Sequence, residues 1–284
     1  MKKLMTLFLA LLVSLAVLAP SAQAADNQLE KIKEKGTLVV GTSPDFPPRE
    51  FYIINDKGEK EIVGSDISLA KAIADKIGVK LELVTTDFNG VIANIQTGTV
   101  DLGISGFSWT QAREEVMDFS VGYSQETGDN GYQGLLVSKE TADKFKTLDE
   151  LKAANLTIGA QGGSIQYELA LQATKPTNVK QYGTLDAAVL ALNAGDIQAM
   201  VVSTSSAEPL VAAFDNLTIL PRDAFDLDPE NKYANNVIGL PKNHDNADLL
   251  KVINEVIETA IKDGTMEKWE TEAKALSTKA LEVE

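Results

Sequence analysis

The clearest sign of this chain's architecture is Ala93-Asn-Ile-Gln-Thr-Gly98-Thr-Val-Asp-Leu-Gly-Ile-Ser105. The residues before Gly98 suit the end of a helix, the glycine suits the left-handed cap that stops it, and the apolar run suits a short buried strand. The same order recurs in Leu190-Ala-Leu-Asn-Ala-Gly195-Asp-Ile-Gln-Ala-Met-Val-Val-Ser203. Two copies of one helix–glycine–strand unit predict two similar lobes.

Another strand and loop precede each copy of this pattern. They are Leu38-Val-Val-Gly41-Thr-Ser-Pro-Asp-Phe46 and Leu156-Thr-Ile-Gly159-Ala-Gln-Gly-Gly-Ser164. Strands that alternate with helices build α/β folds with mainly parallel sheets, so we expect an α/β fold of two such lobes. Ligands of such sheets bind at the carboxyl ends of the strands, which predicts a ligand cleft between the lobes. The loops at these ends are 43–48, 105–108, 162–166 and 203–206.

The loop after the first repeated strand carries the strongest sign of a ligand. Ser105, Gly106 and Ser108 form a small polar turn, and a short polar segment then presents Arg113. A guanidinium binds a carboxylate through two parallel hydrogen bonds, while hydroxyls and glycine backbone add further donors. This combination predicts a site for a small carboxylate. The alternative is a surface arginine that pairs with a neighbouring glutamate.

The other three loops add an aromatic ring, backbone donors and hydroxyls. Phe46 is flanked by prolines, and it either stacks on a ligand or fills the core. Gly163 and Ser164 precede a helix whose first N–H groups and dipole favour an anion, unless they form a plain capped turn. Ser203 follows a buried strand and offers a hydroxyl, although it too suits a simple turn.

The first 24 residues have the pattern of a secretion signal. Lys2 and Lys3 precede an apolar run that ends by Pro20, which is shorter than the roughly 20 residues of a membrane-spanning helix. The small-x-small pattern Ala22-Gln23-Ala24 predicts cleavage before Ala25. We therefore expect an extracytoplasmic protein, either periplasmic or secreted.

Composition excludes several classes of function. The chain has no cysteine, so we expect neither disulfides nor a lipid anchor on an N-terminal cysteine. It has 26 basic and 41 acidic residues, a formal charge of −15, which disfavours nucleic acid and anionic membranes as partners. His244 is the single histidine and stands in a polar turn typical of a surface. We therefore expect no metal, no cofactor and no catalytic set, so that the protein is not an enzyme. We also expect a monomer.

Several further stretches occur in a specific order and spacing: Gly36-Thr-Leu-Val-Val-Gly-Thr42, Gly64-Ser-Asp-Ile-Ser-Leu-Ala-Lys-Ala-Ile-Ala74, Thr110-Gln-Ala-Arg113, Asp118-Phe-Ser-Val-Gly-Tyr123 and Thr147-Leu-Asp-Glu-Leu-Lys152. Together with the loops they cover essentially the whole chain after residue 24. In this order the chain resembles the amino-acid-binding (family 3) branch of the bacterial extracytoplasmic solute-binding proteins of ABC importers. These are receptors of the type II periplasmic-binding-protein-like fold.

The resemblance implies a receptor that captures an amino acid and delivers it to an ABC permease in the membrane. It implies that Arg113 binds the ligand's α-carboxylate and that Phe46 packs on the ligand's side chain. The complete ligand-binding set that it implies is Phe46, Ser105, Gly106, Ser108, Arg113, Gly163, Ser164, Ile165 and Ser203.

The resemblance also implies a hinge. Two crossover strands, near 131–137 and 235–240, would join the lobes, which would close over the ligand. The expected organisation is a signal peptide at 1–24, the first part of lobe I at 25–130, lobe II with the hinge strands at 131–239, and a return to lobe I at 240–284.

The sequence departs from the family's pattern at two of the expected site positions. Ser203 stands where the family usually has an aspartate for the α-amino group, and Arg49 stands where a phenylalanine is expected. A buried ammonium without a counter-charge is costly. Either Glu126, Asp129 or Glu208 replaces the missing acid, or the ligand is peptide-like or another small carboxylate. A dehydratase-type enzyme on the same fold is a further alternative.

Overall fold

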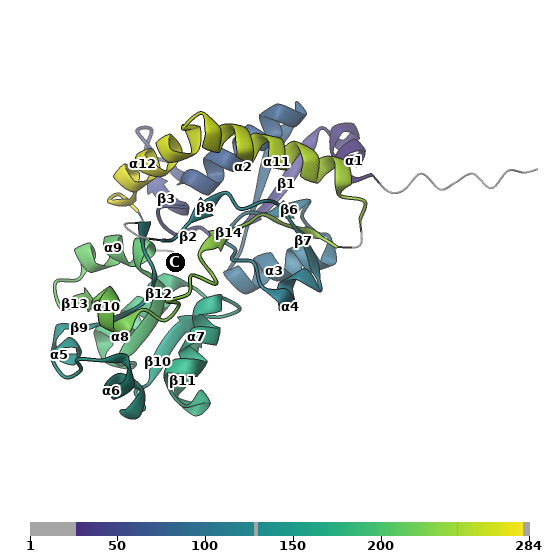
Figure 1. Ribbon diagram of the computed structural model, residues 1–284. Coiled ribbons are helices and arrows are strands. Elements are labelled where there is room, and N and C mark those ends of the chain that lie inside the picture. The colour runs from purple at the N-terminus through teal and green to yellow at the C-terminus, as the bar shows by residue number, and fades with distance from the viewer. Residues whose placement is uncertain (1–26, 128–129, 243, 281–284) are drawn as a thin grey trace, which may run out of the picture.

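The computed structural model describes residues 27–127, 130–242 and 244–280, and within them the chain forms two lobes (Figure 1). Each lobe is built on one five-stranded mixed sheet. The predicted signal peptide, its cleavage point before Ala25, and Asp129 lie outside the described residues. No helix in the described part of the chain is long and apolar enough to span a membrane.

The sheet of lobe I contains the first repeated strand. Its strand order is β5 (Lys80–Thr85), β1 (Thr37–Thr42), β6 (Leu102–Gly103), β15 (Gly239–Pro241) and β7 (Met117–Phe119). β1 runs parallel to β5 and β6, whereas β15 is antiparallel to both of its neighbours. The C-terminal part of the chain therefore returns to lobe I through β15.

The sheet of lobe II repeats this plan strand for strand. Its order is β11 (Val179–Tyr182), β10 (Ile158–Gln161), β12 (Ala199–Ser203), β9 (Gln133–Ser138) and β13 (Leu217–Ile219). β10 is parallel to β11 and β12, and β9 is antiparallel to β12 and β13. The predicted α/β fold of two similar lobes is confirmed.

Glycine caps place the repeated strands as the sequence predicts. Gly98 ends α3 (Phe88–Thr97) and Gly195 ends α8 (Leu185–Ala194), both in the left-handed conformation. A helix can stop sharply there because glycine has no Cβ to clash with the following carbonyl. β6 and β12 then begin within a few residues of these caps.

Helices cover both sheets and enclose apolar cores. In lobe I they are α1 (Gln28–Lys35), α2 (Ser65–Ile77), α3, α4 (Gln111–Glu114), α11 (Ala247–Lys262) and α12 (Thr265–Ser277). In lobe II they are α5 (Lys139–Ala142), α6 (Leu148–Ala153), α7 (Ile165–Ala173), a 3₁₀ turn (Pro176–Asn178), α8, α9 (Thr204–Ala213) and α10 (Arg222–Phe225). Alternate β1 side chains point to opposite faces: Leu38 and Val40 pack with α2 and α11, whereas Val39 packs with α3.

The lobes are joined by a short antiparallel pair, β8 (Ser124–Gln125) and β14 (Asn235–Asn236). The second crossover lies within the predicted 235–240, but the prediction of the first near 131–137 was wrong. Leu135, Leu136 and Val137 belong to β9 and are fully buried in lobe II. An apolar run that is buried on both faces suits a core strand, whereas the crossing between lobes uses polar residues.

A small sheet of lobe I was not predicted. It consists of β2 (Asp45–Phe46), β3 (Glu50–Ile54) and β4 (Lys60–Val63).

Helix α2 follows this small sheet, and the N-cap of α2 is Gly64, so no side chain caps the helix. Asp66 instead points inward, where its carboxylate accepts hydrogen bonds from the Gly106 amide (3.0 Å) and the Tyr123 hydroxyl (2.6 Å). Asp66 therefore ties α2 to the loop at Gly106 and to Tyr123.

Candidate ligand-binding site

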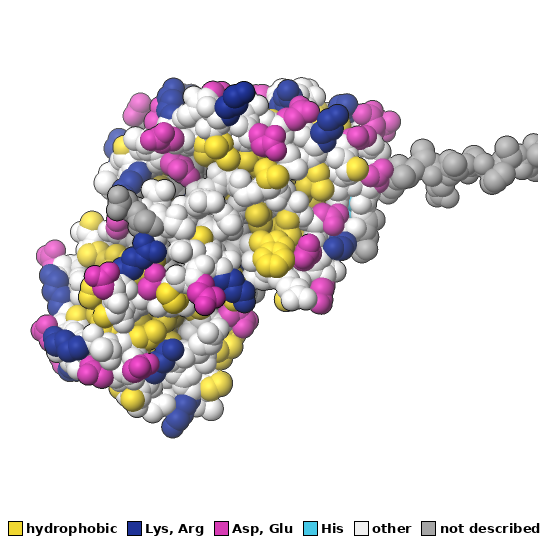
Figure 2. All heavy atoms as spheres, in the orientation of Figure 1, with side chains coloured by type: hydrophobic (Ala, Val, Ile, Leu, Met, Phe, Trp, Pro, Cys, Tyr) yellow, Lys and Arg dark blue, Asp and Glu magenta, His cyan; other side chains and the backbone are white. Residues whose placement is uncertain are grey.

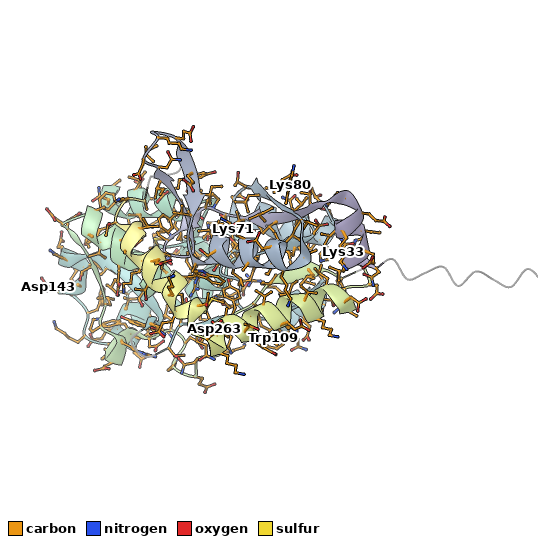
Figure 3. All side chains as sticks on the ribbon, turned by 90° about the horizontal axis from the view of Figure 1, so that it is seen from above. Lys33, Lys71, Lys80, Trp109, Asp143 and Asp263 are labelled. Atoms are coloured by element: carbon orange, nitrogen blue, oxygen red, sulfur yellow. The ribbon has the colours of Figure 1, made fainter. Side chains whose placement is uncertain are left out.

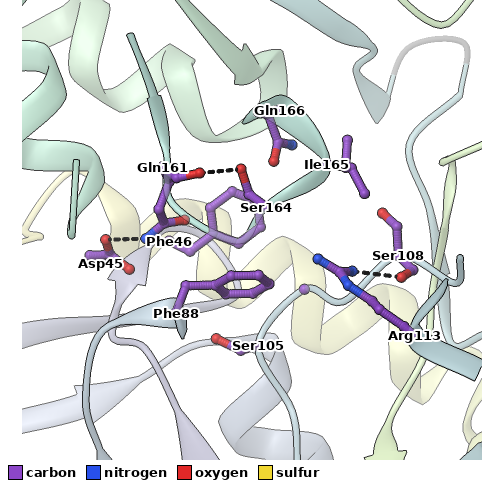
Figure 4. A pocket seen from close by; sticks show the side chains of 11 residues that line it. Asp45, Phe46, Phe88, Ser105, Ser108, Arg113, Gln161, Ser164, Ile165 and Gln166 are labelled. Carbon is purple, nitrogen blue, oxygen red and sulfur yellow. Dashed lines mark hydrogen bonds between the residues drawn. The ribbon is translucent and has the colours of Figure 1, made fainter. Parts of the chain in front are cut away.

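The nine predicted ligand-binding residues gather where the two lobes meet (Figure 4). Seven of them line one pocket: Phe46, Ser105, Gly106, Ser108, Arg113, Ser164 and Ile165. Gly163 lies beside it, and Ser203 does not line it. The free space is about 20 Å³, enough for a water molecule. The lobes are therefore closed on one another in this structure, and they have to part before a larger molecule enters.

Arg113 extends from α4 across the cleft. Its Nη1 donates to the Ser108 carbonyl (2.7 Å) and its Nη2 to the Gly163 carbonyl of the other lobe (2.9 Å). The guanidinium carbon lies 5.5 Å from the centre of the Phe88 ring. Among the described residues, neither neighbouring glutamate forms a salt bridge with Arg113. Burial lowers the pKa of Arg113 to about 10, with only partial compensation from Glu168, so this cation lacks a close counter-charge.

The hydroxyls of the predicted loop hold the loop in place. The Ser105 Oγ donates to Glu50 Oε1 (2.6 Å) and accepts from the Ser43 amide (3.0 Å). The Ser108 Oγ donates to the Tyr233 carbonyl (2.9 Å). The two serines therefore fix the backbone that positions Arg113, and their hydroxyls are already engaged in the closed form.

Gly106 is a point of close approach in this loop. Its φ is +57°, and a Cβ at this position would lie 2.5 Å from the Phe46 ring. We expect Gly106→Ala to lower the free energy of unfolding by about 2–3 kcal/mol, from left-handed strain and from displacement of the ring. Gly58→Ala is the matched control, because Gly58 is also left-handed (φ +79°) but a Cβ added there would have no atom within 4 Å. Urea unfolding measures both, and equal losses would show that the Phe46 contact imposes no constraint.

The first turn of α7 faces the same pocket from lobe II. Ser164 is its N-cap: the Ser164 Oγ accepts from the Tyr167 amide (3.3 Å) and donates to the Gln161 carbonyl (2.7 Å). Ser164 and Ile165 both line the pocket, so the positive end of the helix dipole and Arg113 share one space. Both features favour an anion.

Four further residues line the pocket that the predicted set omits: Asp45, Phe88, Gln161 and Gln166. Phe88 is the first residue of α3 and follows β5, so it stands after a fifth strand end, which the sequence analysis did not include. Gln161 is the last residue of β10. Figure 4 shows the Phe88 ring between Arg113 at one end of the pocket and Asp45 at the other.

Asp45 connects the lobes at that second end. Its Oδ1 accepts from the Ser43 hydroxyl (2.8 Å), and its Oδ2 accepts from the Gln161 side-chain amide (2.9 Å) and the Leu185 backbone amide (2.8 Å). Burial raises the pKa of Asp45 to about 6 against the lowering effect of these bonds, and the nearby Asp186 adds repulsion. A carboxylate with this pKa is short of positive charge around it.

Ser203 lies against an acid from the crossover segment. Its hydroxyl donates to Glu126 Oε1 (2.6 Å), which also accepts from Ser205 (3.0 Å). Of the acids expected to replace the family's aspartate, Glu126 therefore reaches Ser203. Glu208 does not, because it is half-exposed and pairs with Lys274 at 2.8 Å.

Arg49 is the counter-charge of Glu126. Its Nη2 lies 3.4 Å from Glu126 Oε1, and both side chains are buried. Burial alone would lower the pKa of Arg49, but the carboxylates of Glu126 and Asp66 outweigh it and raise that pKa above its ordinary value. The two departures from the family's pattern, Arg49 and Ser203, thus meet at one carboxylate.

His244 differs from its expected place at the surface. It is half-buried, and its Nε2 would lie 3.2 Å from a Cβ added to Gly98, the residue that ends α3. It does not line the pocket. Within the described ranges no group of three or more His, Cys, Asp or Glu side chains is arranged to hold a metal ion.

Comparison with known proteins gives a consistent assignment. Residues 38–272 match the family model of the bacterial extracellular solute-binding proteins, family 3. The L-cystine-binding protein TcyJ of Escherichia coli is 29% identical over 250 residues, 87% of each chain. A probable histidine-binding protein of Campylobacter jejuni is 30% identical and covers 75% of this chain and 78% of its own. An amino acid ABC transporter substrate-binding protein of Streptococcus pneumoniae, solved with L-arginine, is 32% identical with a TM-score of 0.75, covering 90% of this chain and all of that one.

Proposed function

This chain belongs to the bacterial extracellular solute-binding proteins of family 3, and we propose that it captures an amino acid in the cleft between its lobes. The observation that carries the proposal is Arg113, a half-buried guanidinium that shares its pocket with the positive end of α7 and forms no ion pair with any described carboxylate. A ligand carboxylate would replace the Gly163 carbonyl as its acceptor. Relatives whose names specify cystine and histidine, and a neighbour solved with arginine, support an amino acid.

For the ligand's α-ammonium we propose Glu126. Its carboxylate lies at Ser203, and three neutral donors, Ser203, Ser205 and Gln133, orient it. The Arg49 contact is the longest of its bonds at 3.4 Å, so an ammonium that reaches Glu126 when the lobes part adds to this site without breaking a short bond. Phe46 and Phe88 would then pack on the ligand's side chain.

The proposal includes delivery and place of action. The protein works outside the cytoplasm after cleavage before Ala25, as a monomer that hands its ligand to an ABC permease. Asp45, the acid that lines the pocket, accepts all three of its hydrogen bonds as a carboxylate and needs no proton of its own for them. This agrees with a protein that binds its ligand without converting it. The domain limits proposed are 25–130 and 240–284 for lobe I and 131–239 for lobe II, with β15 counted with lobe I from Gly239 onward.

A ligand screen tests the proposal. We expect at least one α-amino acid to bind with a dissociation constant of about 1 μM or tighter, roughly −8 kcal/mol. At a hundredfold excess over that constant it would stabilise the fold by about 2.7 kcal/mol, which is visible as a raised melting temperature. Thermal shift over the twenty amino acids, followed by calorimetry, measures this. The decarboxylated amine of each hit is the control, and tight binding of the amine, or no hit among the amino acids, would contradict the proposal.

A further inference from the structure

The closed structure fills both ends of the ligand pocket with contacts between the lobes. At one end Arg113 of lobe I meets an acceptor of lobe II, the Gly163 carbonyl. At the other end Asp45 of lobe I meets donors of lobe II, the Gln161 side-chain amide and the Leu185 backbone amide. When the lobes part, the first end offers a cation and the second offers a carboxylate. A ligand that replaces both sets of contacts carries an anion at one end and N–H donors at the other.

Asp45 is suited to a charged donor rather than a neutral one. It is the one acid among the described residues that line the pocket. Its side chain is almost fully buried, and burial raises its pKa to about 6. Three neutral donors surround the carboxylate, and the charge of Asp186 repels it. A cation at this position supplies the charge that the protein leaves out.

The wall between the two ends is aromatic. Phe46 and Phe88 lie between Arg113 and Asp45 in the pocket (Figure 4). Ring faces accommodate both the methylene groups of a side chain and a delocalised cation. Small side chains would leave the Asp45 end unfilled, and long apolar ones would bury its carboxylate against hydrocarbon.

We infer that the ligand is an amino acid with a long cationic side chain, and that Asp45 selects it by receiving the side-chain cation. This inference rests on the proposed function, because it takes the α-carboxylate to lie on Arg113. The other buried acids of the cleft do not line this pocket: Glu126, beside Arg49, is the group proposed for the α-ammonium, Asp66 accepts from Gly106 and Tyr123, and Glu50 accepts from Ser105.

Calorimetry with arginine and citrulline tests the inference without any mutation, because citrulline has arginine's shape but no side-chain charge. We expect arginine to bind the native protein at least about 30-fold more tightly than citrulline. In Asp45→Asn the arginine affinity should fall at least about tenfold, while the citrulline affinity changes less than about threefold. Asp56→Asn is the control for charge alone, since Asp56 is exposed in the β3–β4 turn.

The outcomes separate the inference from the proposed function. Citrulline or cystine binding as tightly as arginine would overturn the inference and leave the amino-acid proposal intact. Equal losses of arginine and citrulline in Asp45→Asn would show that Asp45 only holds the lobes together, which also overturns it. Failure of every amino acid to bind the native protein would overturn both.

Discussion

Replacing Arg113 with alanine should weaken amino-acid binding by about 2–5 kcal/mol, a loss of roughly 30-fold to several thousandfold in affinity. The ligand's carboxylate would enter a closed pocket in which the described groups offer it α7's first N–H groups but no guanidinium. The affinity of Arg113→Lys should lie between those of the native protein and Arg113→Ala, because an ammonium keeps the charge but not the paired hydrogen bonds. Titration calorimetry with the best amino acid from the screen measures all three proteins.

The stability of the variant distinguishes binding from folding. Arg113 is a half-buried cation without a close counter-charge among the described residues, so its removal should leave the melting temperature of the ligand-free protein within a few degrees of native. Arg222→Ala removes the same group far from the pocket, on α10, where it pairs with Asp226 at 3.1 Å, and should bind ligand normally. Native affinity in Arg113→Ala would exclude Arg113 as the carboxylate's partner.

The sequence predicted the parts of the site that are local. Gly98 and Gly195 stop helices by backbone conformation, so the strands after them, and the loops at their ends, follow from short patterns. Arg113 was found for the same reason, because the turn that carries it directly follows such a strand. Phe88 stands at the end of β5 and was within reach of the same reasoning.

The parts that the sequence did not predict depend on distant partners. Asp45 stands in a loop that was singled out for Phe46, and its decisive bonds come from residues 116 and 140 positions away. Nothing near it in the sequence indicates that lobe II supplies its donors. Asp66 lies in the first turn of α2, but its side chain does not cap the helix and instead accepts hydrogen bonds from its tertiary partners Gly106 and Tyr123. Tertiary hydrogen bonds outweigh a cap that contributes about 1 kcal/mol.

On the face shown in Figure 2, acidic and basic side chains are interspersed over both lobes. Lys71 and Asp143, labelled in Figure 3, are both exposed. The overall charge of −15 bears on large partners, since it disfavours nucleic acid and anionic membranes. The charge of the ligand is set instead by the few groups inside the cleft.

Arg49→Met should destabilise the ligand-free protein by about 3–5 kcal/mol, because it leaves a buried carboxylate without its cation. Arg49 pairs with Glu126, and its charge also attracts the carboxylate of Asp66, which accepts its hydrogen bonds from the neutral groups of Gly106 and Tyr123. Methionine fills a similar length but supplies no charge, so the carboxylates would repel one another in a dry site. Chemical denaturation with the native protein as reference measures the loss.

A double-mutant cycle tests whether the ion pair is the cause. Glu126→Gln keeps an acceptor for Ser203 and Ser205 but removes the charge, so Arg49→Met with Glu126→Gln should recover at least half of the stability lost in Arg49→Met alone. The same double variant should bind an amino acid poorly, since the acid proposed for the α-ammonium is gone. Additive losses would instead mean that Arg49 stabilises the cleft by packing. Glu126 would then be independent of Arg49, and the two departures at 49 and 203 would have separate explanations.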